Sequence, residues 1–207
     1  VARPSSVITG GAAGAAAIQL EDQEFPKKCG HTPGRRVIAT NDMVAKIRVA
    51  IDSRSSPDFL VIARTDARSA LGLDEALRRG EAYARAGADI LFIESPESVD
   101  EMNRIGSAFD LPLVANMVEK GRTPVLSRAA LESIGYRIAI FPVSALLAAV
   151  RAMTGVYRTL QGSGSTESID VPMADFGELT KLMGFEDIWD FEKRYAEPVV
   201  ATHGEQI

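Results

Sequence analysis

The chain has 207 residues, 46% of them apolar and 25% charged, which is typical of a globular protein with a sizeable core. The net charge of −5, the lack of a basic tract and the lack of an apolar run near 18 residues argue against nucleic-acid and membrane partners. A single cysteine excludes an internal disulfide framework and predicts a reducing, cytoplasmic location.

Five short apolar runs follow one another along the chain, and each leads into a polar residue or a proline. They are 16–20 before Glu21, 59–63 before Arg64, 90–93 before Glu94, 113–115 before Asn116 and 138–141 before Pro142. Continuous apolar runs of this length are typical of strands that are buried on both faces, as in a parallel sheet. We therefore expect five parallel strands.

Amphipathic stretches lie between and after these runs, at 41–54, 74–86, 98–109, 127–134 and 144–160. The third stretch begins with Ser98 and has Glu101 three residues later, which predicts a capping box. Two further short helices are expected at 175–183 and 186–195. Strand followed by helix, five times over, predicts an α/β protein.

Polar residues close four of the five runs. In a (β/α)₈ barrel the carboxyl ends of the strands surround one pocket, and catalytic groups lie there. A carboxylate such as Glu21 suits Mg²⁺, directly or through water. Arg64 suits a substrate carboxylate, with an ion pair to Asp66 or Glu94 as the alternative. Five strands fit either an open sheet or a barrel whose first three βα units are missing.

The only cysteine lies in the segment PKKCGHTPG, residues 26–34, whose prolines and glycines exclude a long regular element. Lys27, Lys28 and His31 flank Cys29, and positive neighbours favour a thiol that transfers protons or acts as a nucleophile. The alternative is an exposed cysteine without a role. No second cysteine stands at C-x-x-C spacing, so a zinc site is not expected.

Six segments together resemble the isocitrate lyase and phosphoenolpyruvate mutase superfamily, from about Gly14 to Tyr195. They are IQLEDQ, PKKCGH, VIARTDA, AGADILFIESPES, PLVANMVEKGRTP and IGYRIAIFPVSAL. The pair KKCGH and ARTDA points to the branch with methylisocitrate lyase, 2,3-dimethylmalate lyase and carboxyphosphonoenolpyruvate mutase-like proteins. The resemblance implies a (β/α)₈ TIM barrel that binds Mg²⁺ (or Mn²⁺) and a small dicarboxylate.

The resemblance also implies roles for individual residues. Glu21 belongs to the outer shell of the metal, through water. Cys29 is the catalytic acid on a mobile loop, with Lys27 and His31 as catalytic neighbours. The substrate is bound by Arg64, Glu94, Asn116, Gly30 and His31.

The superfamily places an Asp-x-Asp metal pair after the third strand, and no Asp-x-Asp occurs in this chain. We therefore expect the first three βα units, about 90 residues at about 30 per unit, to be missing. The expected organisation is a partial barrel at 1–161, a linker at 162–172, C-terminal helices at 173–196 and a tail at 197–207. A homo-oligomer, a tetramer that exchanges a C-terminal helix, is implied by the resemblance.

Three hypotheses about function remain. The first is a Mg²⁺-dependent carbon–carbon lyase that cleaves a 2-hydroxy dicarboxylate, of the 2-alkylmalate or methylisocitrate type, to an α-keto acid and a carboxylate. The second is a phosphonomutase, or an oxaloacetate hydrolase or decarboxylase, of the same superfamily. The third is a non-catalytic truncated barrel.

Overall fold

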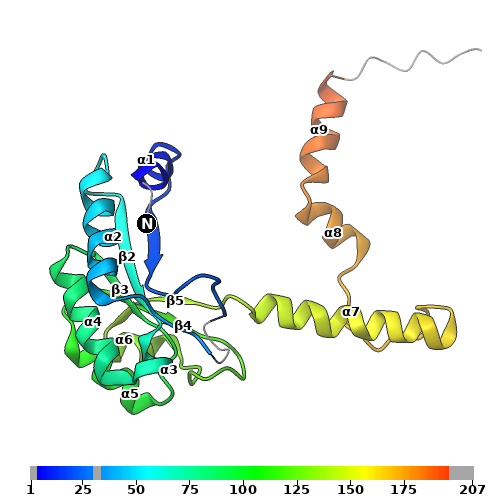
Figure 1. Cartoon of the computed structure of the whole chain (residues 1–207). Coiled ribbons are helices and arrows are strands. Elements are labelled where there is room, and N and C mark those ends of the chain that lie inside the picture. The colour runs from blue at the N-terminus through cyan, green and yellow to red at the C-terminus, as the bar shows by residue number, and fades with distance from the viewer. Residues whose placement is uncertain (1–3, 30–33, 196–207) are drawn as a thin grey trace, which may run out of the picture. The chain divides into compact units, whose positions relative to one another are not determined.

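A computed structural model describes residues 4–29 and 34–195 and contains a five-stranded parallel sheet with helices against it (Figure 1). The strands lie side by side in chain order, and every neighbouring pair is parallel. They are β1 (Ala17–Glu21), β2 (Leu60–Thr65), β3 (Ile90–Ile93), β4 (Leu113–Asn116) and β5 (Tyr136–Ile140). The predicted α/β fold with five parallel strands is confirmed.

The helices follow the predicted stretches closely. They are α1 (Pro4–Ala12), α2 (Thr40–Ser53), α3 (Ala67–Leu71), α4 (Leu73–Arg85), α5 (Val99–Ala108), α6 (Arg128–Ile134), α7 (Ser144–Ser163), α8 (Phe176–Leu182) and α9 (Phe185–Tyr195). Helix α7 continues past Leu160, where the sequence predicted its end, and α1 and α3 were not predicted. Adjacent glycines at 10 and 11 disfavour a helix, but Val7 is buried against Phe59 and holds α1 in place.

The main core lies between one face of the sheet and helices α2, α4, α5 and α6. The helices contribute large buried side chains such as Met43, Tyr83 and Ile105. Side chains alternate along a strand, so every second residue points to the other face, where Phe92 and Val114 form a smaller buried cluster. Arg64, Glu94 and Asn116 continue that second face at the carboxyl ends of their strands.

The start of α5 differs from the predicted capping box in one respect. The Ser98 hydroxyl accepts a hydrogen bond from the Glu101 backbone N–H at 3.1 Å, as predicted. The Glu101 side chain instead accepts from the Glu97 backbone N–H and from Arg68. Ser98 is therefore an N-cap without the reciprocal bond, because an arginine competes for the carboxylate.

The chain divides into two compact units, Val1–Leu147 and Ala148–Ile207. In the second unit, Asp175 and Glu178 form a complete capping box at α8, and the Trp189 ring of α9 meets Phe185 edge-on at 6.0 Å. Within the described residues, no helix combines the length and hydrophobicity that a membrane span needs. The predicted boundaries at 161, 172 and 196 stay predictions.

Candidate active site

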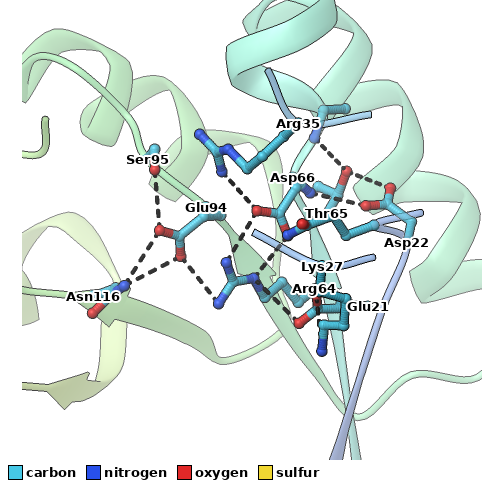
Figure 2. Close-up of polar contacts among 12 residues, drawn as sticks. Glu21, Asp22, Lys27, Arg35, Arg64, Thr65, Asp66, Glu94, Ser95 and Asn116 are labelled. Atoms are coloured by element: carbon cyan, nitrogen blue, oxygen red, sulfur yellow. Dashed lines mark hydrogen bonds and ion pairs between the residues drawn. The ribbon is translucent and has the colours of Figure 1, made fainter. Parts of the chain in front are cut away.

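Arg64, near the carboxyl end of β2, is the centre of a cluster of charged side chains (Figure 2). Its Nε and NH2 groups lie 2.9 and 3.0 Å from the two oxygens of Asp66. Its NH1 lies 3.6 Å from Glu94 Oε2, and its Nε lies 3.9 Å from Glu21 Oε2. The guanidinium carbon also lies 5.0 Å from the centroid of the Phe92 ring, within cation–π distance.

The charge of Arg64 is fixed by these neighbours. Burial alone would lower its pKa, but the hydrogen bond to Asp66 and the charges of Glu94, Asp66 and Glu21 outweigh burial and raise the pKa. Arg64 therefore stays cationic throughout the pH range in which the protein is folded, and it is suited to hold an anion.

Glu94 follows β3 directly and is fully buried. The Ser95 hydroxyl donates to Glu94 Oε1 at 3.0 Å, and Asn116 Nδ2 lies 3.3 and 3.4 Å from the two carboxylate oxygens. Ser95 has a φ of 60°, a left-handed conformation that is unfavourable for a residue other than glycine. Such strain persists where the surroundings demand it, and here Ser95 helps to hold the Glu94 side chain at the strand end.

Lys27 and Glu21 connect the cysteine-containing loop to the end of β1. Lys27 Nζ lies 3.0 Å from Glu21 Oε1. The base of the loop is closed by an antiparallel bridge between Gln23 and Val37. Cys29 follows Lys27 by two residues and is exposed. The predicted site residues Gly30 and His31 lie outside the described residues.

Asp22 is a fully buried carboxylate that contacts the residues next to Arg64 in the sequence. Its Oδ2 accepts hydrogen bonds from Thr65 Oγ1 and Tyr83 OH, both at 2.7 Å, and from Arg79 NH1 at 3.0 Å. Its Oδ1 accepts from the Asp66 backbone N–H at 2.9 Å. Burial first, and then the negative charge of Asp22, raise the pKa of Tyr83, so that its hydroxyl remains a donor.

The structure thus brings together Glu21, Lys27, Arg64, Glu94 and Asn116. The alternative considered for Arg64, an ion pair with Asp66 or Glu94, is present as well. The sequence named Asp66 only as a possible partner of Arg64, and it did not predict the roles of Asp22 and Arg35. The position of Asp22 next to Glu21 was the signal that could have found Asp22.

The described residues do not fit a directly bound metal ion. They contain no group of three or more His, Cys, Asp or Glu side chains that could hold one. Glu21 and Glu94, the two acidic residues at the strand ends, both face Arg64, and Glu21 also contacts Lys27. Mg²⁺ usually takes one or two carboxylates together with water and substrate oxygens. Because both strand-end carboxylates are already paired with cations, the part of the chain that the structure describes fits an outer-shell role better than direct ligation.

Comparison with known proteins agrees with this geometry. The profile of the phosphoenolpyruvate phosphomutase family matches residues 5–161. The chain belongs to this family. It is 50% identical to 2,3-dimethylmalate lyase from Eubacterium barkeri over 184 residues, which cover 89% of this chain and 64% of that protein. It is 42% identical to 2-methylisocitrate lyase from Aeropyrum pernix over 185 residues, which cover 89% of this chain and 58% of that protein.

Solved structures of phosphoenolpyruvate mutase relatives have the same fold. A 2,3-dimethylmalate lyase, described as a member of the PEP mutase/isocitrate lyase superfamily, has a TM-score of 0.83 at 30% identity and covers 98% of this chain and 68% of its own. An oxaloacetate acetylhydrolase with 3,3-difluorooxalacetate has a TM-score of 0.83 at 28% identity, with coverages of 95% and 66%. A phosphonopyruvate hydrolase with oxalate and Mg²⁺ has a TM-score of 0.77 at 32% identity, with coverages of 94% and 68%. The predicted superfamily is therefore confirmed.

Proposed function

We propose that the natural protein is a carbon–carbon lyase that cleaves a 2-hydroxy dicarboxylate of the 2-alkylmalate or methylisocitrate type. The observation that carries the proposal is the cluster at the strand ends, in which Arg64 is held among Glu21, Glu94 and Asp66. The two curated relatives described above are both named as lyases. Because the chain spans less than two thirds of their length, its activity and substrate are proposals.

The proposed reaction is a retro-aldol cleavage. A base removes the proton of the 2-hydroxyl group, the C2–C3 bond breaks, and C2 becomes the carbonyl carbon of an α-keto acid. The electron pair of the broken bond passes to C3, whose carboxylate stabilises the negative charge. Protonation of C3 by Cys29 then gives the second product, a carboxylate.

The strand-end residues bind and orient this substrate in our proposal. Arg64 pairs with one substrate carboxylate, because a guanidinium can donate two parallel hydrogen bonds to it. Glu94 accepts hydrogen bonds from neighbouring polar groups of the substrate, and the Asn116 amide donates hydrogen bonds to them. Gly30 and His31, with Lys27, complete the site from the loop. Closure of the loop would exclude water from the carbanion.

We propose that the activity requires Mg²⁺ or Mn²⁺, with ligands that lie outside this chain and with Glu21 in the outer shell. Charge balance supports a divalent ion. A dicarboxylate that enters an electrically neutral cluster leaves two negative charges uncompensated, and one divalent cation would offset them. The cluster contains three cations and three carboxylates: Lys27, Arg35, Arg64, Glu21, Asp66 and Glu94.

The same proposal extends to the whole protein. Five parallel strands in chain order, with β1 and β5 at the open edges, support a (β/α)₈ barrel whose first three βα units lie outside this chain. Exposed Ile138, Ile140 and Phe141 at the β5 edge fit a surface that such units would cover. The single cysteine supports a cytoplasmic location. A second copy of the chain is the proposed partner of α8 and α9.

The second candidate is chemistry on oxaloacetate or a phosphonate. It is favoured by the similarity to an oxaloacetate acetylhydrolase and a phosphonopyruvate hydrolase, whose folds match this chain closely. Those reactions do not need an acid that protonates a carbanion in the same way, so Cys29 favours the lyase. A non-catalytic truncated barrel is the third candidate, and the lack of a metal-binding group among the described residues favours it.

The decisive experiment is steady-state kinetics of the natural full-length protein on a panel of 2-hydroxy dicarboxylates, with release of the keto acid as the signal. Cys29→Ser preserves the shape of the side chain but supplies a far weaker acid. General acid catalysis typically contributes about 10² to 10⁴ in rate, so kcat should fall by about that factor while KM changes little. Arg64→Ala should also raise KM, because it removes a partner of the substrate carboxylate.

Three further outcomes separate the candidates. If Cys29→Ser cleaves every active substrate at the parent rate, Cys29 is not the acid, and oxaloacetate or phosphonate chemistry becomes the better proposal. A chelator that leaves turnover unchanged would contradict the metal requirement. A full-length protein that turns over no compound of either class would favour the non-catalytic barrel.

A further inference from the structure

Arg35 and Asp66 form a buried ion pair beside the candidate site. Their side chains are 1% and 0% exposed, and Arg35 NH1 lies 2.6 Å from Asp66 Oδ1. Arg35 NH2 also donates to the Ser69 hydroxyl. A buried ion pair is tolerated only with good geometry and further hydrogen bonds, because both ions lose their hydration. The Arg35–Asp66 pair is therefore a candidate for a role other than stabilising the fold.

Asp66 is shared between two arginines, as Figure 2 shows. Its Oδ1 accepts from Arg35 NH1 and, at 3.0 Å, from Arg64 NH2, while its Oδ2 accepts from Arg64 Nε at 2.9 Å. Asp66 thus holds the Nε side of the Arg64 guanidinium. NH1, the group farthest from this contact, lies on the side of Glu94.

Asp66 itself has little freedom to move. Its backbone N–H donates to Asp22 Oδ1 at 2.9 Å, and the buried Asp22 is fixed in turn by Thr65, Tyr83 and Arg79. A rotation of Arg64 would have to break both of its contacts with a carboxylate that is also held by the buried Arg35. The orientation of Arg64 is therefore determined by residues that lie deeper in the protein.

The second arginine also changes the charge that Arg64 offers to a ligand. Three carboxylates face Arg64, and the charge of Asp66 is the one that Arg35 shares. Without Arg35, Arg64 alone would balance Asp66 in addition to Glu94 and Glu21, and a ligand carboxylate would have to compete with an excess of negative charge.

We propose that Arg35 and Asp66 are positioning residues that fix the orientation of Arg64 and preserve its positive charge for a substrate carboxylate. The inference rests on the proposed function in one respect, namely that Arg64 binds a carboxylate. It adds a residue from the end of the cysteine-containing loop to the residues that determine substrate affinity.

The test is binding of oxalate to the natural full-length protein, measured by calorimetry in buffer that contains Mg²⁺. Arg35→Met should weaken binding about tenfold, because hydrogen bonds to charged groups are worth about that much. Arg35→Lys keeps the charge but cannot contact Asp66 and Ser69 together, so its loss should be smaller. In an Arg64→Met background, Arg35→Met should cause no further loss, because its effect is transmitted through Arg64.

Arg54→Met is the matched control. Arg54 NH1 lies 2.8 Å from Asp89 Oδ2 in a partly buried pair, and Asp89 precedes β3 at the opposite end of the strands. This variant should lower the melting temperature and leave oxalate binding unchanged. If both Arg35→Met and Arg35→Lys fail to fold, as judged by their melting curves, the Arg35–Asp66 pair is needed for stability alone and the inference is wrong.

The outcomes for the two proposals are distinct. Three results would each overturn the inference. The first is additive losses of affinity from Arg35→Met and Arg64→Met, and the second is a change below about twofold in Arg35→Met. The third is a parent protein that does not bind oxalate. A parent that binds oxalate with the expected coupling but cleaves no 2-hydroxy dicarboxylate would contradict the proposed function and support the positioning role.

Discussion

Asp22 shows how one side chain can stabilise both the fold and the candidate site. It is fully buried, and its two oxygens accept four hydrogen bonds from β2, α4 and the residue after β2. The bonds reach residues between 43 and 61 positions away in the sequence. A buried carboxylate is stable only because these donors replace the water that it loses.

Asp22→Asn should therefore lower the free energy of unfolding by about 2 to 4 kcal/mol, because it removes one of the two carboxylates that pair with the buried Arg79 and disturbs the buried hydrogen bonds of Asp22. Urea denaturation followed by far-UV circular dichroism measures the change. Tyr83→Phe is the matched control, since it removes one of the four donors and should cost about 1 kcal/mol. Equal stability of Asp22→Asn and the parent would show that the charge of Asp22 is unimportant.

The first turn of α4 illustrates electrostatics at the level of an element. Glu75 lies near the helix N-terminus, where the helix dipole favours a carboxylate. It accepts hydrogen bonds from Arg78 at 2.6 Å and from Arg79 at 2.8 Å. These bonds, that with Arg78 first, lower the pKa of Glu75 to about 2 against the opposing effect of burial.

Glu75→Gln should cause a pH-dependent loss of stability, because it removes the ionised carboxylate. A carboxylate whose folded pKa is lowered stabilises the protein above its unfolded pKa of about 4.3, and the contribution disappears as the pH falls toward 2. Arg78, the first partner of Glu75, is 56% exposed, so solvent screens this pair and we expect less than about 1 kcal/mol at pH 7. Melting temperatures of the two proteins at pH 7, 4 and 3 should converge as the pH decreases.

Glu81→Gln provides the comparison on the same helix, because it breaks the exposed pair between Glu81 and Arg85. A difference between parent and Glu75→Gln that stays constant from pH 7 to pH 3 would contradict the explanation by Glu75 ionisation.

The sequence predicted the elements well wherever a short-range pattern determines them. Continuous apolar runs identified all five strands, because strands of a parallel sheet are buried on both faces. The two helices that it missed have other causes: α1 depends on the burial of Val7 against Phe59, and α3 has only five residues. No local pattern carries either signal.

The candidate site was predictable in part for the same reason. Glu21, Arg64, Glu94 and Asn116 end their strands, and parallel strands bring such ends together. Arg35 could not be recognised, because its partner Asp66 is 31 residues away and its burial arises only from the tertiary structure.

At the scale of the whole molecule, helices α8 and α9 carry apolar side chains that their own unit does not cover. Phe176 and Leu182 are 80% and 83% exposed, and Ile188 and Phe191 are more than half exposed. Exposed apolar surface of this kind is typical of interaction sites. We propose that a second copy of the chain covers it.

The natural full-length protein should therefore be an oligomer by light scattering at micromolar concentration. Replacement of both Ile188 and Phe191 by Asp should shift it toward the monomer, because charges would enter the proposed interface. Glu192→Ala, on the same helix, should leave the oligomer intact. A monodisperse monomer of the parent protein would contradict the prediction.

The position of Trp189 has a consequence for spectroscopy. It is the only tryptophan of the chain, it lies in α9, and 46% of its surface is exposed. The charged cluster around Arg64 lies in the other unit. Intrinsic fluorescence excited at the indole band will therefore report on the second unit, and a blue shift of its emission on concentration will register burial of α9 by another subunit without any label.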